Sequence, residues 1–111
     1  MDTIFALSTA PGKAGVAIIR VSGADAFAGV EELVGDLPSP RRAALRTVRA
    51  TSGEAIDTSL MLVFDEGQSF TGEPTVEFQC HGSTAVVSAI LEALGRQQGF
   101  RPAEPGEFTR R

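Results

Sequence analysis

Two apolar runs rich in β-branched residues open the chain. Residues 2–8 read DTIFALS and residues 15–22 read GVAIIRVS, with a Pro-Gly pair in the segment between them. Runs of this composition, separated by proline and glycine, favour two β-strands joined by a short loop. We therefore expect a strand, a loop and a second strand at the start of the chain.

A helix is expected after the second strand. Its apolar positions recur near helical spacing at Phe27, Val30, Leu33 and Val34. Ser22, with Asp25 three residues later, resembles a capping box that would start the helix, and Gly35 would end it. The prolines at positions 38 and 40 then favour extended backbone, because proline cannot donate into a helical ladder.

The second half of the chain alternates between apolar and polar residues. Residues 43–50 and 55–64 flank a four-residue loop that contains glycine, which predicts a β-hairpin. Residues 75–80, TVEFQC, predict another strand, and Ser83 can cap a second helix that ends between residues 95 and 99. The apolar positions of that helix are Val87, Ile90, Leu91 and Leu94.

These elements predict the fold class. Two strands, a crossing helix, a hairpin, another strand and another helix indicate an α+β domain with a mixed β-sheet and two or more packed helices, rather than a regular βαβ repeat. A chain of 111 residues, 42% of them hydrophobic, has room for one compact core. We interpret residues 1–111 as a single domain, and residues 105–111, which lack a cap or a polar tail, as the boundary of a fragment.

Composition limits the function classes. The formal charge of −4 gives no broad basic field, so we do not expect the chain alone to bind RNA. The basic run Arg41, Arg42, Arg46 and Arg49 is interpreted as a solvated sheet edge with no nucleic-acid role. A single cysteine, Cys80, excludes an internal disulfide and is typical of a reducing compartment, which favours a cytoplasmic location. No apolar run approaches the roughly 20 residues that span a bilayer, so no membrane role is expected.

Several site types are excluded by spacing. Gly12-Lys13 is followed by a predicted strand, whereas a phosphate-binding P-loop needs GxxxxGK[ST] between a strand and a helix. The only histidine, His81, has no ligand or triad partners at the usual spacings, so metal and triad chemistry are not expected. We predict neither a catalytic residue nor a metal site.

Two charged residues interrupt apolar strands. Arg20 lies in the run VAIIRV, and Glu77 stands between Val76 and Phe78. Burial of an unpaired ion is costly, so each side chain must either pair or face a polar cleft. The pattern leaves three possibilities open: they are exposed edge charges, they pair with each other structurally, or they line a pocket built on the sheet.

Two further segments have alternative interpretations. His81-Gly82-Ser83 lies at a strand-to-helix junction that could hold an anion, although plain helix capping is the favoured interpretation. Residues 69–73, SFTGE, could form a ligand loop with Phe70 as a flat contact, or only a packed connection. The residues alone do not decide between these.

Three sequence blocks resemble the start of one family. DTIFALSTAPGKAGVAIIRVSG, SFTGEPTVEFQCHGS and RPAEPGEFTRR, in this order and spacing, resemble the N-terminal domain of the MnmE/TrmE family of tRNA-modification GTPases. The resemblance covers nearly the whole chain, with residues 24–49 the generic part. The family usually has two glycines after the histidine of its HGG segment, whereas here Gly82 is followed by Ser83.

The resemblance implies a ligand and a partner for this domain. It implies a fold similar to the tetrahydrofolate-binding aminomethyltransferases, a homodimer, and a bound 5-formyl-tetrahydrofolate or related one-carbon folate near the dimer interface. Arg20 and Glu77 match the family's folate-binding positions, while a further folate-contacting lysine lies beyond this chain. A carboxylate can accept the adjacent N–H donors of a pterin, and a guanidinium can bind an anionic or carbonyl group.

The resemblance also implies a larger parent protein. A helical domain and an inserted G domain, which hydrolyses GTP with potassium and magnesium, would follow residue 111. With an FAD-dependent MnmG-type partner, the parent adds an aminomethyl-type group to carbon 5 of the wobble uridine in tRNA. This chain would supply the folate site and part of the dimer contact, without a catalytic centre of its own.

Two other interpretations remain possible. The chain could be a stand-alone folate-dependent aminomethyltransferase-like enzyme. Alternatively, it could be a purely structural dimerisation module in which Arg20 and Glu77 pair only with each other. Folate binding separates the structural module from the other two.

Overall fold

The computed structural model describes residues 2–8, 15–65 and 72–110. In this part of the chain, strands and helices alternate irregularly along the sequence. The elements are β1 (Thr3–Leu7), β2 (Val16–Ser22), α1 (Ala26–Val34), β3 (Ala44–Arg49), β4 (Ala55–Phe64), β5 (Thr75–His81), α2 (Thr84–Gly95), β6 (Phe100–Pro102) and α3 (Glu107–Arg110).

The six strands form one mixed sheet in the order β3-β4-β5-β2-β1-β6. All neighbours are antiparallel except β1 and β6, which are parallel. The predicted α+β class, the mixed sheet and the hairpin of β3 and β4 are confirmed. The two central strands, β2 and β5, pair over their whole lengths, from Val16 opposite His81 to Ser22 opposite Thr75.

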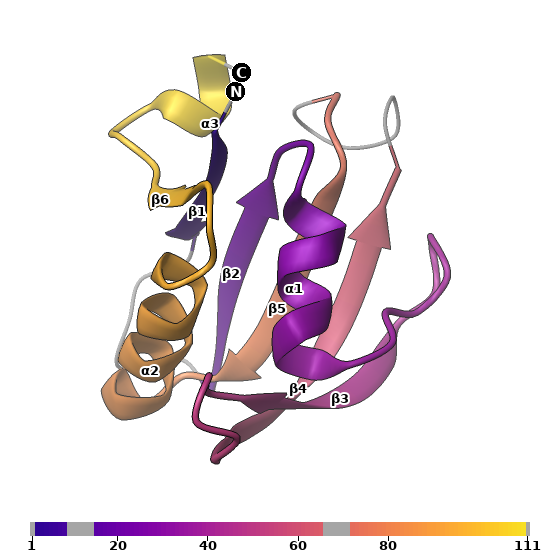
Figure 1. Ribbon diagram of the computed structural model, residues 1–111, viewed down its shortest axis with the longest axis vertical. Helices are drawn as coiled ribbons and strands as arrows, with labels where there is room; N and C mark the ends of the chain where they lie inside the picture. The colour runs from indigo at the N-terminus through magenta and orange to yellow at the C-terminus, as the bar shows by residue number, and fades with distance from the viewer. Residues whose placement is uncertain (1, 9–14, 66–71, 111) are drawn as a thin grey trace.

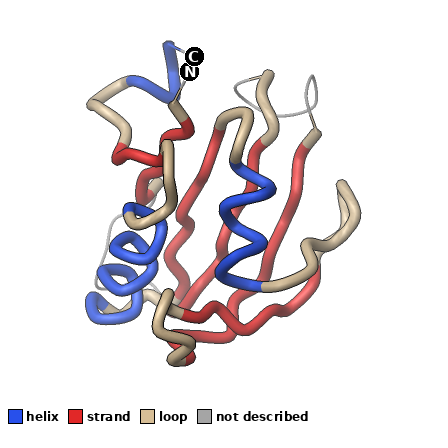
Figure 2. The backbone as a smooth tube through the Cα atoms, in the orientation of Figure 1, coloured by secondary structure: helices blue, strands red, loops and turns tan. Residues whose placement is uncertain are grey.

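Helices α1 and α2 lie side by side on the same face of the sheet (Figure 1). The core fills the space between them and the strands, and its largest fully buried side chains include Phe78, Ile19, Met61, Ile90 and Leu94. Figure 2 shows the same two layers, with the helices in front of the strands. No helix in the described ranges has the length and apolar character needed to cross a bilayer.

The opposite sheet face is not covered by α1 or α2, and we call it the open face. Alternation along the strands places apolar side chains there, in rows that cross the sheet. Its apolar residues include Val16, Ile18, Leu45, Leu60, Leu62 and Phe64. Val16 and Leu45 are 51% and 64% exposed, which is unusual for large apolar side chains on a strand.

The predicted capping box at the start of α1 is wrong. Ser22 is the last, buried residue of β2, and the N-cap is Asp25, whose side chain makes no capping hydrogen bond. The backbone N–H of Asp25 instead donates to Oγ1 of Thr3 at 3.2 Å. This tertiary contact ties the N-cap residue to β1, and no side chain of the described residues caps α1. The predicted cap of α2 is confirmed, because Oγ of Ser83 accepts the N–H of Val86 at 3.2 Å.

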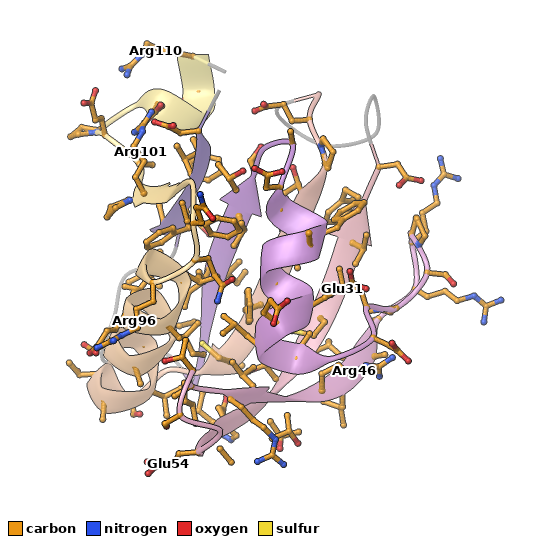
Figure 3. The ribbon with its side chains drawn as sticks, viewed as in Figure 1. Glu31, Arg46, Glu54, Arg96, Arg101 and Arg110 are labelled. Atoms are coloured by element: carbon orange, nitrogen blue, oxygen red, sulfur yellow. The ribbon has the colours of Figure 1, made fainter. Side chains whose placement is uncertain are left out.

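β6 and α3 lie in a region for which the sequence predicted no helix or strand. The three residues of β6 pair with β1, and the N–H of Ala103 continues the pairing by donating to the carbonyl of Phe5 at 2.9 Å. Arg101, labelled in Figure 3, forms ion pairs with Asp2 and with Glu107 of α3. Asp2 lies 99 residues from Arg101 in the chain, so no local pattern reveals that contact, whereas Glu107 is only six residues away.

Gly23 provides a test of the packing between β1 and β2. It has φ +147°, and an added Cβ would lie 2.7 Å from the Thr3 Cα. We expect Gly23→Ala to lower the free energy of unfolding by about 2 kcal/mol or more, because the clash is with backbone and the dihedral suits only glycine. Urea denaturation measures this change.

Gly95→Ala is the matched control for this prediction. An added Cβ there would meet only the Phe5 Cζ at 3.6 Å, an ordinary contact, and the residue is helical. This variant should leave stability unchanged or raise it by up to about 1 kcal/mol. Equal losses in the two variants would contradict the packing that the structure shows.

Candidate ligand-binding site

Arg20 and Glu77 face each other across the two central strands. They are register partners on β2 and β5, and Arg20 Nε lies 2.7 Å from Glu77 Oε2. Both project on the open face, with side-chain exposures of 36% and 14%. The edge-charge interpretation is wrong, since β2 and β5 are interior strands. The structure does pair the two charges, which was one of the three possibilities that the sequence left open.

The ion pair uses only part of each group. The guanidinium donates through Nε alone, so its two terminal nitrogens have no partner within the described part of the chain. Glu77 likewise accepts through Oε2, and its Oε1 has no described partner. A guanidinium has five N–H donors and a carboxylate has two accepting oxygens. The pair therefore retains donors and an acceptor for a ligand.

Arg20 also lines a cleft of about 380 Å³. The cleft lies between the ends of β1 and β2 and the segment that links β6 to α3. Its lining residues are Ala6, Leu7, Ser8, Arg20, Ala103, Glu104, Pro105, Gly106, Phe108 and Thr109. This volume is within the usual range of roughly 300–1,000 Å³ for small-molecule sites. Sequence reasoning missed the wall formed by residues 103–109, because it depends on the parallel pairing of β6 with β1.

A larger hollow of about 450 Å³ lies on the other side of the molecule, between α1 and the turn before β6. Its charged residues, Asp25 and Glu32, are both acidic, and Gln97 and Gln98 supply its other polar side chains. It contains neither Arg20 nor Glu77. We therefore assign the candidate site to the smaller cleft and the adjoining ion pair.

Asp57 is another charged residue within a strand, in β4, and sequence analysis did not single it out. Its carboxylate is only 8% exposed and accepts three hydrogen bonds: from the His81 backbone N–H at 3.0 Å, the His81 ring at 2.6 Å and the Ser59 hydroxyl at 3.0 Å. Burial by itself raises the pKa of Asp57, but these hydrogen bonds outweigh burial and hold the pKa below its ordinary value. Its position in the apolar strand β4 is the same signal that identified Arg20 and Glu77.

The strand-to-helix junction performs the capping role that the sequence favoured. Ser83 caps α2, and the His81 ring is held by Asp57. Cys80 is buried, and its thiol is directed to the carbonyl of Ala17. Burial raises the pKa of the Cys80 thiol, which keeps it protonated and unreactive. Residues 69–71 of the predicted ligand loop, and Gly12-Lys13, lie outside the described residues.

Comparison with known proteins decides the family. The family model described as "GTP-binding protein TrmE N-terminus" matches residues 3–111. The chain belongs to this family. It is 52% identical over 111 residues to a tRNA modification GTPase MnmE of Dinoroseobacter shibae, and 56% identical over 111 residues to one of Jannaschia sp.. In both, the alignment covers 100% of this chain and 26% of the relative.

A mitochondrial protein is also similar to this chain. The chain is 50% identical over 111 residues to the mitochondrial 5-taurinomethyluridine-tRNA synthase subunit GTPB3 of Danio rerio, covering 99% of this chain and 22% of that protein. The chain thus spans about a quarter of the length of these relatives. The TrmE N-terminal match includes both central strands and the segment that forms the cleft wall.

The lowered pKa of Asp57 predicts how stability depends on pH. A carboxyl group with a depressed folded-state pKa contributes stability above its unfolded pKa of about 4, and this contribution is lost as pH falls through the folded pKa. We expect the free energy of unfolding to fall below about pH 4, and to fall less steeply in Asp57→Asn. Urea titrations at several pH values measure both slopes.

Glu92→Gln is the control for the pH experiment. Glu92 forms an exposed pair with Arg96 within α2, and exposed pairs contribute little to stability. Its slope below pH 4 should match that of the parent chain. If Asp57→Asn also retained the parent's slope, the carboxylate would not have the environment described above.

Proposed function

We propose that this chain is the folate-binding and homodimer-forming N-terminal domain of a tRNA-modification GTPase. The proposal rests on one observation above all: among the described residues Arg20 is paired through Nε alone, which leaves its terminal N–H groups for a ligand at the wall of a cleft. The TrmE N-terminal match and the names of the relatives support it independently.

The chemistry of the site fits a one-carbon folate such as 5-formyl-tetrahydrofolate. The aliphatic and aromatic residues of the cleft, Leu7, Pro105 and Phe108, suit the flat rings of a folate. The free donors of Arg20 suit a carboxylate or carbonyl group, and Glu77 Oε1 suits the adjacent N–H donors of a pterin. The folate supplies the one-carbon unit, while these residues bind and orient it.

The open face supports the homodimer. Its aliphatic side chains lie on the same face as the Arg20–Glu77 pair, with Gln79 between Ile18 and Leu60, and exposed apolar side chains gathered on one face commonly mark interfaces. A two-fold axis would place the same patch of a second copy against it. The folate site would then lie next to the dimer contact, and covering this face would strengthen the electrostatic interactions of Arg20 and Glu77 by excluding water.

The activity of the whole protein is part of the same proposal. GTP hydrolysis with potassium and magnesium, contact with an FAD-dependent MnmG-type partner and modification of wobble uridine would be carried out with segments beyond these 111 residues. The chain described here would supply the one-carbon donor site. A stand-alone aminomethyltransferase is less favoured, because the matched relatives carry this sequence as about a quarter of a longer protein.

The first functional prediction concerns folate binding at this site. Arg20→Ala and Glu77→Ala should each weaken binding of 5-formyl-tetrahydrofolate by roughly tenfold to a hundredfold, because each removes a charge-assisted hydrogen bond. Isothermal titration calorimetry measures the affinities, and circular dichroism checks the fold. Arg96→Ala, which removes an exposed arginine from α2, is the matched control and should bind as the parent does.

The rival structural module predicts a different result. If Arg20 and Glu77 serve only as a structural pair, the parent chain does not bind folate and both variants are destabilised by the loss of a partner. Unchanged folate affinity in both variants would show that the pocket is assigned wrongly.

The dimer makes a separate prediction. The parent chain should sediment as a dimer at micromolar concentration, and Leu45→Asp should shift it toward monomer by placing a charge in the apolar interface. Ala85→Asp, which adds the same charge at an exposed position in the first turn of α2, should not. A monomeric parent chain, or equal effects of the two variants, would contradict an interface on the open face.

A further inference from the structure

The arginines of this chain fall into two groups. Outside residues 41–49, every arginine that the structure describes forms an ion pair with a carboxylate: Arg20, Arg96, Arg101 and Arg110. Within that segment, Arg42, Arg46 and Arg49 have no carboxylate of the described residues at ion-pair distance. Their positive charges are not neutralised by a described residue.

These three arginines follow the outer edge of the sheet. β3 is the terminal strand of the sheet, and Arg42 lies just before it. At about 3.3 Å per residue, the three side chains are distributed over roughly 20 Å. Arg42 and Arg49 are exposed and Arg46 is half-buried. Arg46 lies on the helix-covered face of β3 with Val48, and Arg49 follows the register shift at the end of the strand, so positive charge runs along this edge but not on a single face. The formal net charge of the chain is −4.

Backbone carbonyls hold two of the side chains in place. Arg46 donates from Nε to the carbonyl of Asp36 at 2.7 Å, and Figure 3 shows it beside the end of α1. Arg49 donates to the carbonyl of Gly53 at 3.1 Å. A carbonyl orients a guanidinium without cancelling its charge. Less side-chain freedom is then lost when an anion binds.

We infer that this edge, defined by Arg42, Arg46 and Arg49, contacts the phosphate backbone of RNA. The inference rests on the proposed function, since the relatives' names assign them to tRNA modification. A guanidinium binds phosphate through parallel N–H donors, and charges at separate points of one sheet edge can contact separate phosphates of a polynucleotide. The sequence favoured a solvated sheet edge for these arginines. That interpretation does not explain why every described arginine elsewhere pairs with a carboxylate and these three do not.

A binding experiment with a matched charge change tests the inference. The parent chain should bind a short fluorescent RNA hairpin at low salt, measured by anisotropy, with affinity that falls as salt rises. The double variant Arg42→Ala/Arg49→Ala should bind about tenfold more weakly or worse, and its slope of log affinity against log salt should be smaller by about 1.4. Both residues are exposed, so circular dichroism should show an unchanged fold.

Arg96→Glu changes the net charge by the same amount on another surface, and should keep the parent's RNA affinity within about twofold. Equal weakening by both changes would overturn the inference in favour of a net-charge effect. Absence of RNA binding would also overturn it, as would binding of the parent to phosphatidylserine vesicles but not to RNA. Folate titration of the same proteins keeps the two proposals separate, because intact folate binding without RNA binding refutes only the RNA contact.

Discussion

The antiparallel pairing of β2 with β5 is the constraint on which both the core and the candidate site depend. In its register, Ile19 lies opposite Phe78 on the covered face, and Arg20 lies opposite Glu77 on the open face. A slip of one residue would move every side chain of one strand to the other face. Phe78 would then leave the core, and the two charges would lose each other. The hydrophobic energy that holds the core therefore also positions the ion pair.

The helices give the sheet two different faces. α1 and α2 pack on one side, where they bury the core with the strands. The other side keeps its aliphatic side chains uncovered by these helices and carries the Arg20–Glu77 pair at the centre of the sheet. The pair is partly exposed, at 36% for Arg20 and 14% for Glu77, and removal of its remaining water would cost free energy unless a new partner replaced that water. The proposed folate site and the proposed contact with a second copy would both use this surface.

The site is completed by contacts between distant parts of the chain. The parallel pairing of β6 with β1 brings residues 103–109 beside the end of β2, where they form the second wall of the cleft. Arg101 strengthens this arrangement by contacting Asp2 and Glu107. The cleft exists only after the first and last elements have met, so its formation is coupled to folding of the whole domain.

The sequence by itself determined the central strands, the start of α2 and the two candidate site residues. Alternation predicted β2, the β3–β4 hairpin and β5, Ser83 predicted the start of α2, and the cost of burying unpaired ions singled out Arg20 and Glu77. Each of these signals is local, because side-chain periodicity and capping operate over a few residues. Only the tertiary structure decided that the two charges face each other and that Thr3 binds the N–H of Asp25 at the start of α1. It also decided that Asp57 holds His81 and that β6 forms the sixth strand. These depend on register and on pairing between distant segments, where the free energy comes from contacts that short sequence windows do not contain.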